Sequence, residues 1–330
     1  MNLATQAGLI AGTSVLAIAG TGTAGDLDSV IDGIINDSAT ISGDDHFSMS
    51  GIFAYGFAHT DSDDYNGGIG SASLSFEGEA GGWNWAFNYV LGANGAGYYA
   101  GAANELRDYG IWQEMDNGLA FGFGNMKSNF FGANSVDEAD TLSLGNSETG
   151  EALEGAGEQI ALCYSADQFK VSMQAYDAGD SGTDFRVDFL AMGSWDNCGC
   201  FGSAAGSEST LVIGAGMSDG DRFDGNTFDV TYKMDAWAVH AAMTDIDSSS
   251  GDGVANAWES MTIQASYFFG DSTMAYVTYE DIDTTGADDL DIGVNHWYAD
   301  NCKATLEIDF ENDANTDDDM TISGQVQFTF

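Results

Sequence analysis

The chain contains no proline, and it has no long apolar run after its first two dozen positions. A membrane-spanning helix needs about 20 consecutive apolar residues, so a helical membrane protein is excluded. The lack of proline is compatible with a chain rich in β-strands, because proline cannot donate a hydrogen bond to the ladder of a sheet.

Basic residues are also scarce. Seven Lys and Arg stand against 53 Asp and Glu, which gives a formal net charge of −46. Because nucleic-acid binding requires Lys and Arg to neutralise phosphates, we expect no nucleic-acid partner. Hydrophobic residues make up 44% of the chain, which argues against a disordered acidic protein. Two readings of the acidity stay open: a field that attracts cations, or adaptation to saline water.

Cysteine and histidine are rare. The four cysteines are Cys163, Cys198, Cys200 and Cys302. They lack the paired Cys-x-x-Cys spacing of a zinc site, so we predict no metal site from them. A structural disulfide is favoured instead, in which the Cys198–Cys200 pair either closes on itself or reaches Cys163. The four histidines are scattered and suggest no Ser-His-Asp group, so we expect no enzyme.

The first two segments differ from the rest of the chain. Residues 1 to 24 hold an apolar run, Ala7 to Ala19, followed by small residues. This pattern predicts a signal peptide that is cut after Ala24. The segment departs from the usual pattern in one respect, because Met1 to Gln6 has no Lys or Arg. Residues 25 to 45 include five aliphatic side chains at helical spacing with aspartates between them. This pattern predicts a short acidic amphipathic helix, either packed on the rest of the protein or serving in self-association or plugging. The aliphatic residues are Leu27, Val30, Ile31, Ile34 and Ile35.

From His46 onward, apolar residues recur at every second position, which is the spacing of a β-strand. Together with turn residues such as Gly81-Gly82 and Asn117-Gly118, the pattern predicts sixteen strands. Ser194 to Glu208 is a long connection where a short turn is expected, and it is either a misplaced strand or an insertion. The fourth to fifteenth strands are predicted at 106–114, 119–126, 158–164, from 169, 184–193, 210–217, 227–233, 236–244, 260–269, 273–280, 290–297 and 303–310.

The last eleven residues, Met320 to Phe330, form the sixteenth predicted strand and end on an aromatic residue. A strand of about ten residues crosses a bilayer when it is tilted. This ending resembles the closing strand of Gram-negative outer-membrane β-barrels. The resemblance implies a multi-pass barrel in the bacterial outer membrane, contact with its lipid, and recognition of Phe330 by the barrel-assembly machinery.

The predicted connections alternate in length. Those after odd-numbered strands are long, and most others have two to four residues, as in a transmembrane barrel with short periplasmic turns and long external loops. A sheet in a bilayer must close so that every backbone group has a partner. We therefore predict an all-β fold, a transmembrane antiparallel barrel of about sixteen strands over residues 46 to 330. Such a barrel is too wide for side chains to fill, so its polar lining surrounds water.

Strand count, loop order and the terminal Phe330 resemble the sixteen-stranded general porins of Gram-negative outer membranes. The resemblance implies passive diffusion of small hydrophilic solutes and ions, a third loop folded into the lumen as a constriction, and a homotrimer latched by the second loop, here Gly92 to Asn104. The Pro-Glu-Phe-Gly-Gly type of third loop is missing from this chain.

The third long loop, Lys127 to Gly157, holds the candidate pore constriction. It is rich in carboxylates, and Arg107 is the only base near its foot, since the other wall candidates are Lys170, Arg186, Lys233 and Lys303. We therefore expect a negative constriction that selects cations, against the alternative of an ordinary exposed acidic loop. The predicted acidic residues are Asp137, Glu138, Asp140, Glu148, Glu151 and Glu154.

No cofactor is expected. About half of the acidic residues fall in the long loops, so diffuse binding of Ca²⁺ or Mg²⁺ at the outer rim is predicted. The segment Ser62 to Gly67 resembles the start of an EF-hand loop, but Ser73 stands where a bidentate Glu is needed. Alternative functions are a substrate-specific channel and an adhesin or structural barrel. A barrel hydrolase is the rival enzyme class.

Overall fold

The computed structural model describes residues 47–60, 66–91, 105–132, 142, 144, 149, 156–177, 181–197, 202–203, 206–221, 224–247, 257–283, 287–312 and 319–330. The expected signal peptide (1–24) and acidic helix (25–45) lie outside these residues. No helix in the described part of the chain combines the length and the apolar character that a membrane crossing needs.

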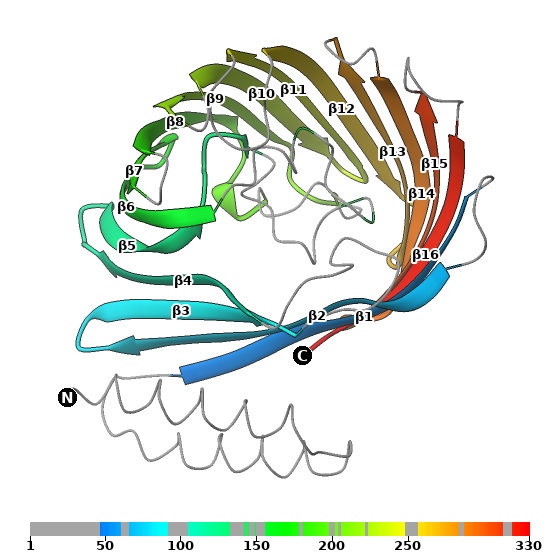
Figure 1. Ribbon diagram of the computed structural model, residues 1–330, viewed down its shortest axis with the longest axis horizontal. Coiled ribbons are helices and arrows are strands. Elements are labelled where there is room, and N and C mark those ends of the chain that lie inside the picture. Colours follow the sequence, from blue (N-terminus) through cyan, green and yellow to red (C-terminus); the bar gives the residue numbers. More distant parts are fainter. Residues whose placement is uncertain are drawn as a thin grey trace.

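Sixteen antiparallel strands form one closed barrel, in which each strand pairs with its neighbours in sequence and β1 pairs with β16 (Figure 1). A short 3₁₀ helix, η3 (Trp195–Asn197), lies between β8 and β9. The strands are β1 (Phe47–Thr60), β2 (Asn66–Ala80), β3 (Trp83–Val90), β4 (Glu105–Glu114), β5 (Leu119–Lys127), β6 (Ala156–Ser165), β7 (Phe169–Asp177), β8 (Ser181–Met192), β9 (Thr210–Gly220), β10 (Asp224–Met234), β11 (Trp237–Asp247), β12 (Trp258–Phe268), β13 (Thr273–Ile282), β14 (Ala287–Ala299), β15 (Cys302–Asn312) and β16 (Asp319–Thr329).

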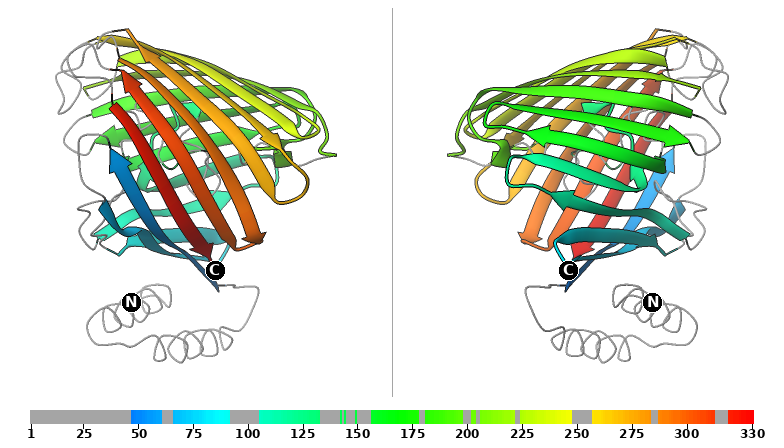
Figure 2. Two further views of the ribbon diagram at one scale, coloured as in Figure 1. Left: turned by 90° about the vertical axis from the view of Figure 1, so that its right-hand side faces the viewer. Right: turned by 90° about the vertical axis from the view of Figure 1, so that its left-hand side faces the viewer.

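The predicted strand count and the pairing of the last strand with the first are confirmed. Several strands are longer than predicted at the end that carries the long connections, which we call the loop end. The prediction for β14 began at Leu290, whereas the strand begins at Ala287. The period-two pattern marks only the stretch with one apolar face, but the hydrogen-bond ladder continues through polar residues beyond it. Figure 2 shows that the strands cross the wall obliquely.

The long connection Ser194 to Glu208 lies at the opposite end of the barrel, which we call the turn end. The strands on either side of it, β8 and β9, pair directly with each other over most of their length. The segment is therefore an insertion, and the alternative of a misplaced strand is wrong.

The two faces of the wall separate by polarity as predicted. On β11, exposed residues alternate strictly with buried ones. Val239 and Met243 face outward and are 41% and 63% exposed, whereas His240 and Thr244 face the lumen and are each 3% exposed. Outward apolar side chains suit lipid, and the closed ladder leaves no sheet edge in it.

The seam between β1 and β16 is held by two pairs of a glycine and an aromatic ring. Gly51 and Phe330 exchange backbone hydrogen bonds of 3.0 and 3.1 Å. A Cβ atom on Gly51 would lie 2.6 Å from the ring of Phe330, and a Cβ on Gly324 would lie 2.5 Å from the ring of its register partner Phe57. The ring in each pair covers the glycine, so the seam packs tightly on both strands.

We expect Gly51→Ala to weaken the barrel, because the new methyl group must displace both the Phe330 ring and the Ser73 carbonyl. Overpacking of this kind costs about 1–3 kcal/mol of unfolding free energy. The matched control is Gly110→Ala on β4, where the nearest atom to an added Cβ is Met126 Sδ at 3.5 Å. Urea unfolding in detergent micelles, followed by tryptophan fluorescence, measures both variants. Equal stability of the two variants would contradict a tightly packed seam.

Candidate functional site

The beginning of the connection between β5 and β6 packs against the inner face of the barrel. Phe130 and Phe131 are each 1% exposed and share a buried apolar cluster with Ala242 and Ile246 of β11. Trp258 and Ile282, from β12 and β13, complete this cluster. Two large aromatic side chains thereby carry this segment away from β5 and across the lumen to β11.

Arg186 on β8 connects this segment to charged groups of the wall. Its guanidinium donates to Asp229 at 2.7 Å and to Asp188 at 2.6 Å, and a longer contact of 3.4 Å reaches the carbonyl of Phe130. Asp229 lies on β10, two strands away, and Gly214 on the strand between them leaves the space that the two side chains occupy. The charge of Arg186 is thus buried with two carboxylates around it, which supplies the pairing that a buried charge requires.

Hydroxyl and amide groups add to this anchor. Ser128 and Ser218 donate to the two carboxylate oxygens of Asp184 at 2.6 and 2.7 Å. The backbone N–H of Asn129 donates to Gln174 at 2.8 Å. The segment 128–130 is therefore fixed to inward side chains of β7 and β8, and Ser218 of β9 and Asp229 of β10 hold the β8 side chains in place.

Three further described residues of the same connection contact the wall formed by β12 to β15. The carbonyl of Leu142 accepts from Asn295 at 2.9 Å, and the N–H of Leu144 donates to Glu307 at 3.2 Å. Thr149 donates through its N–H to Glu280 at 3.2 Å and through its hydroxyl to Ser260 at 2.8 Å. Leu142 also packs on Met274 and Tyr276. The described parts of this connection therefore lie against the inner faces of β7 to β15.

The predicted constriction residues are not placed by these contacts. Asp137, Glu138, Asp140, Glu148, Glu151 and Glu154 lie outside the described residues, as does the side chain of Arg107. Their role stays a prediction. The sequence did identify Arg186 as a wall base, but it gave no sign that Asp188 and Asp229 neutralise it. Asp188 shares a strand face with Arg186, whereas the contact with Asp229 depends on the register of three strands.

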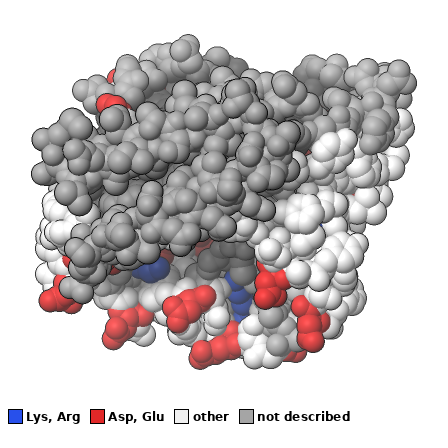
Figure 3. Space-filling view, turned by 90° about the horizontal axis from the view of Figure 1, so that it is seen from below, with Lys and Arg blue, Asp and Glu red and all other residues white. Residues whose placement is uncertain are grey.

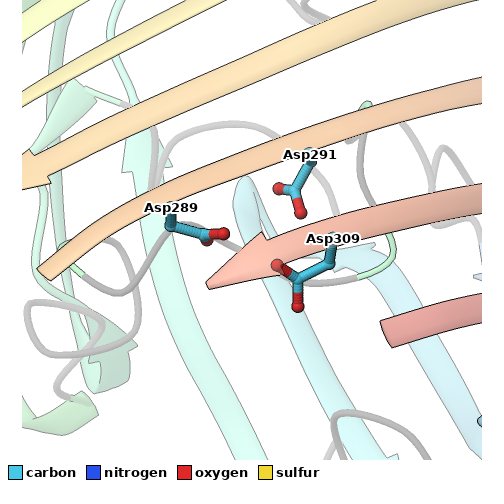
Figure 4. Close-up of side chains that lie close together, drawn as sticks. All are labelled: Asp289, Asp291 and Asp309. Carbon is cyan, nitrogen blue, oxygen red and sulfur yellow. The ribbon is translucent and has the colours of Figure 1, made fainter. Parts of the chain in front are cut away.

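A cluster of carboxylates on β14 and β15 was not predicted. Asp289 and Asp291 on β14 and Asp309 on β15 each offer an oxygen within 4.8 Å of the others, and all three are half-buried. Figure 4 shows the carboxylates of the two strands turned toward one another. Asp291 and Asp309 are register partners, and Asp289 is the partner of Glu280 on β13. The sequence placed residues before Leu290 in or beside a loop, so this part of the inner wall was missed.

The insertion between β8 and β9 enters the barrel from the turn end. Ser203 donates to the carbonyl of Asp235 at 2.6 Å, and the N–H of Gly206 donates to the Asp235 carboxylate at 2.5 Å. Asp235 has a φ of 51°, which belongs to the tight turn between β10 and β11. Gly202 is buried against Phe268 and Met274, and Met274 also contacts Leu142. Segments from both ends of the barrel therefore meet on one methionine.

The expected disulfide does not involve Cys163. Cys163 and Cys302 both carry free thiols. Cys198 and Cys200 lie outside the described residues, so a bridge between these two stays a prediction.

Acidic residues are not confined to the loop end. Figure 3 shows acidic side chains along one rim, below a wall that is largely white where it is described. The short connections at the turn end carry five exposed aspartates, Asp116, Asp167, Asp235, Asp271 and Asp300. An acidic rim at the turn end is an addition to the sequence-based picture, which placed the acidity mainly in the long loops.

No model of a known protein family and no curated protein matches this sequence. Solved structures do match. OmpT in its trimer form, an outer membrane protein of Vibrio cholerae, is 12% identical with a TM-score of 0.64, and the match covers 87% of this chain and 99% of that one. A triple mutant of the Rhodopseudomonas blastica porin is 16% identical with a TM-score of 0.56, over 86% and 100% of the two chains.

A third match is the outer membrane channel DcaP of Acinetobacter baumannii. It is 10% identical with a TM-score of 0.56, and the match covers 87% of this chain and 97% of that one. Identities this low establish likeness of fold alone. In strand number, closure and shape, this protein resembles the sixteen-stranded porins, as its sequence predicted.

Proposed function

We propose that this protein is a porin of a bacterial outer membrane, through which small hydrophilic solutes and ions diffuse passively, cations above all. The observation that carries the proposal is the inner wall. Polar side chains line it, and one long connection is anchored to it. Sixteen strands enclose more space than their own side chains fill, so a polar lining implies a water-filled passage.

The connection between β5 and β6 is proposed as the constriction. Its contacts with Arg186, Asp184, Glu280 and Glu307 hold the described parts against the wall. The acidic residues between and beyond these contacts are those that the resemblance to general porins assigns to the narrowest part of the pore. This supports a diffusion pore over an adhesin or structural barrel, which needs no anchored segment in its lumen.

Charge supports selection of cations. Arg186 is shared by Asp188 and Asp229, so this group of three has a net negative charge. The opposite wall carries Asp289, Asp291 and Asp309 close together. Rings of acidic side chains favour cations in a pore.

Partners follow from the same proposal. The likeness to OmpT in its trimer form supports a homotrimer. Exposed aromatic side chains lie on the outer face of β1, including Phe53 and Tyr55, which are 41% and 54% exposed, and such a face suits a neighbouring subunit. The proposed latch, Gly92 to Asn104, lies outside the described residues. Membrane lipid and the barrel-assembly machinery, which would read Phe330, are further proposed partners.

Liposome swelling tests the proposed function. Vesicles that contain the protein should admit sugars at rates that fall smoothly with sugar size and rise linearly with sugar concentration. A rate that saturates for one sugar would indicate a substrate-specific channel, which is the alternative function. Vesicles that admit no sugar or salt would rule out a pore.

Replacing three carboxylates of the proposed constriction with neutral amides should lower the preference for cations; these are Asp137, Glu138 and Asp140. The same replacement on the outer rim, where we place Asp317, Asp318 and Asp319, should lower it less. The screening length is about 30 Å at 0.01 M salt and about 3 Å at 1 M, so selectivity should be strong in dilute salt and should weaken in concentrated salt. Reversal potentials across a planar bilayer with a KCl gradient measure both effects. Chloride preference in the unmodified protein, or a larger effect of the rim triple, would contradict the proposed constriction.

Arg186→Gln should make the single-channel current unsteady, because it removes the contact with the Phe130 carbonyl and leaves Asp229 without its cation. The control is Lys170→Gln on the neighbouring β7, which removes the same charge from a side chain that lies 4.5 Å above the Trp195 ring. Single-channel recording in 1 M KCl, where surface charge is screened, compares the two. A steady current of unchanged size from Arg186→Gln would show that this contact does not hold the constriction.

A further inference from the structure

The insertion between β8 and β9 is fixed to the barrel where it begins. The indole N–H of Trp195, in η3, donates to the carbonyl groups of Ala166 at 3.3 Å and Asp167 at 3.1 Å, in the turn between β6 and β7. The side-chain amide of Asn197 donates to the hydroxyl of Thr210 at 3.2 Å. These contacts hold the start of the insertion in one place at the turn end.

The described middle of the insertion is buried on the lumen side of the wall. Ser203 is 4% exposed, and its hydroxyl donates to the carbonyl of Asp235 at 2.6 Å. Gly202 is also buried, and a Cβ atom added to it would lie 3.2 Å from Met274 Sδ and 3.3 Å from the Phe268 ring. Met274 and Phe268 are register partners on β13 and β12, on the face that lines the lumen. Backbone that leaves β8 thus reaches the inner face of β12 and β13 before it returns to β9.

Apolar side chains gather where the insertion meets the wall. Leu142, Met274 and Tyr276 form a buried cluster, and Phe268 and Trp297 pack against it. The rings of Phe268 and Trp297 are stacked with their centroids 5.4 Å apart. Most of the other buried side chains on the described wall are polar. This apolar patch is therefore an exception in the lining, and it lies at the turn end, where Phe268 is the last residue of β12.

A fixed segment beside an apolar patch restricts a passage in two ways. Its backbone and side chains occupy part of the cross-section, and apolar surfaces hold water weakly, so hydrated ions pass them less readily. The other connections at the turn end have two to four residues, which is enough for a turn between adjacent strands and no more. Of the connections between described strands at this end, only the insertion is long enough to cross several strands.

We propose that the insertion between β8 and β9 forms a second narrowing of the passage, at the turn end, separate from the constriction proposed for the connection between β5 and β6. This inference rests on the proposed porin function. Ser203 and Gly202 hold the segment against the wall, and Met274 supports it from β13. A solute that crosses the membrane meets both narrowings, so the size limit at each entrance of the pore reports a different segment.

Polymer exclusion in a planar bilayer tests this inference on the full chain. Polyethylene glycols of graded size lower the single-channel current in KCl when they enter the pore, so polymer added to one side reports the size limit of that entrance. A variant in which Asn-Gly replaces residues 195–207 has a short turn in place of the insertion. It should carry a larger current, and the size limit should rise on one side while it stays unchanged on the other.

Met274→Ala is the second variant. Because both Leu142 and Gly202 pack on Met274, removal of its side chain should raise the size limits on both sides. The matched control is Met243→Ala on β11, which removes a methionine that is 63% exposed on the outer face and should change neither limit. Circular dichroism establishes that each variant is folded.

Unchanged size limits on both sides of the Asn-Gly variant would overturn the second narrowing. If that variant does not fold, Met274→Ala decides the question, and limits equal to those of the Met243→Ala control overturn the inference. An unmodified protein that carries no current would instead overturn the proposed porin function. The two failures are therefore distinguishable, since a conducting protein whose Asn-Gly variant keeps both limits retains the pore and loses only the second narrowing.

Discussion

Closure of the sheet is the constraint on which the rest of the structure depends. In hydrocarbon, every backbone N–H and C=O group of a strand needs a partner from the protein, and the pairing of β1 with β16 supplies the last row. The two glycine–aromatic pairs at the seam let these strands approach closely while their rings keep the outer surface apolar. Because the side-chain period of a strand is two, closure in this register also fixes which residues face the lumen. A slip of β1 by one residue against its neighbours would turn Phe53 and Tyr55 toward the lumen.

The lumen holds charged groups that would be costly in a solid protein core. Arg186 tolerates its burial because two carboxylates and a carbonyl surround it. Glu280 and Glu307 accept hydrogen bonds from backbone N–H groups of the connection between β5 and β6. These two contacts bind the segment through its backbone, whereas other residues bind the wall through their side chains: Ser128, Phe130, Phe131, Leu142 and Thr149.

The sequence predicted the architecture well because one physical signal repeats sixteen times. A wall with lipid outside and water inside forces the alternation of apolar and polar residues, and the aromatic terminus indicated the closing strand. The strand ends were less accurate, since the ladder at Ala287 and Asp224 extends beyond the two-faced stretch. Contacts across the lumen could not be predicted from the sequence. The pairing of Arg186 with Asp229 and the meeting of Asp291 with Asp309 depend on register and barrel curvature, and single-strand periodicity carries neither. The insertion at Ser194 to Glu208 was visible only as an exception to the alternation of loop lengths.

The side chain of Met274 acts as a shared spacer between two segments that come from opposite ends of the barrel. Leu142 packs on it from the connection between β5 and β6, and Gly202 packs on it from the insertion between β8 and β9. A methionine is unbranched and flexible, so it can fill an irregular gap between two backbones. A larger or smaller residue at this one position would shift both segments at once. The two segments are therefore linked through one side chain, and a change in its size alters the packing of both.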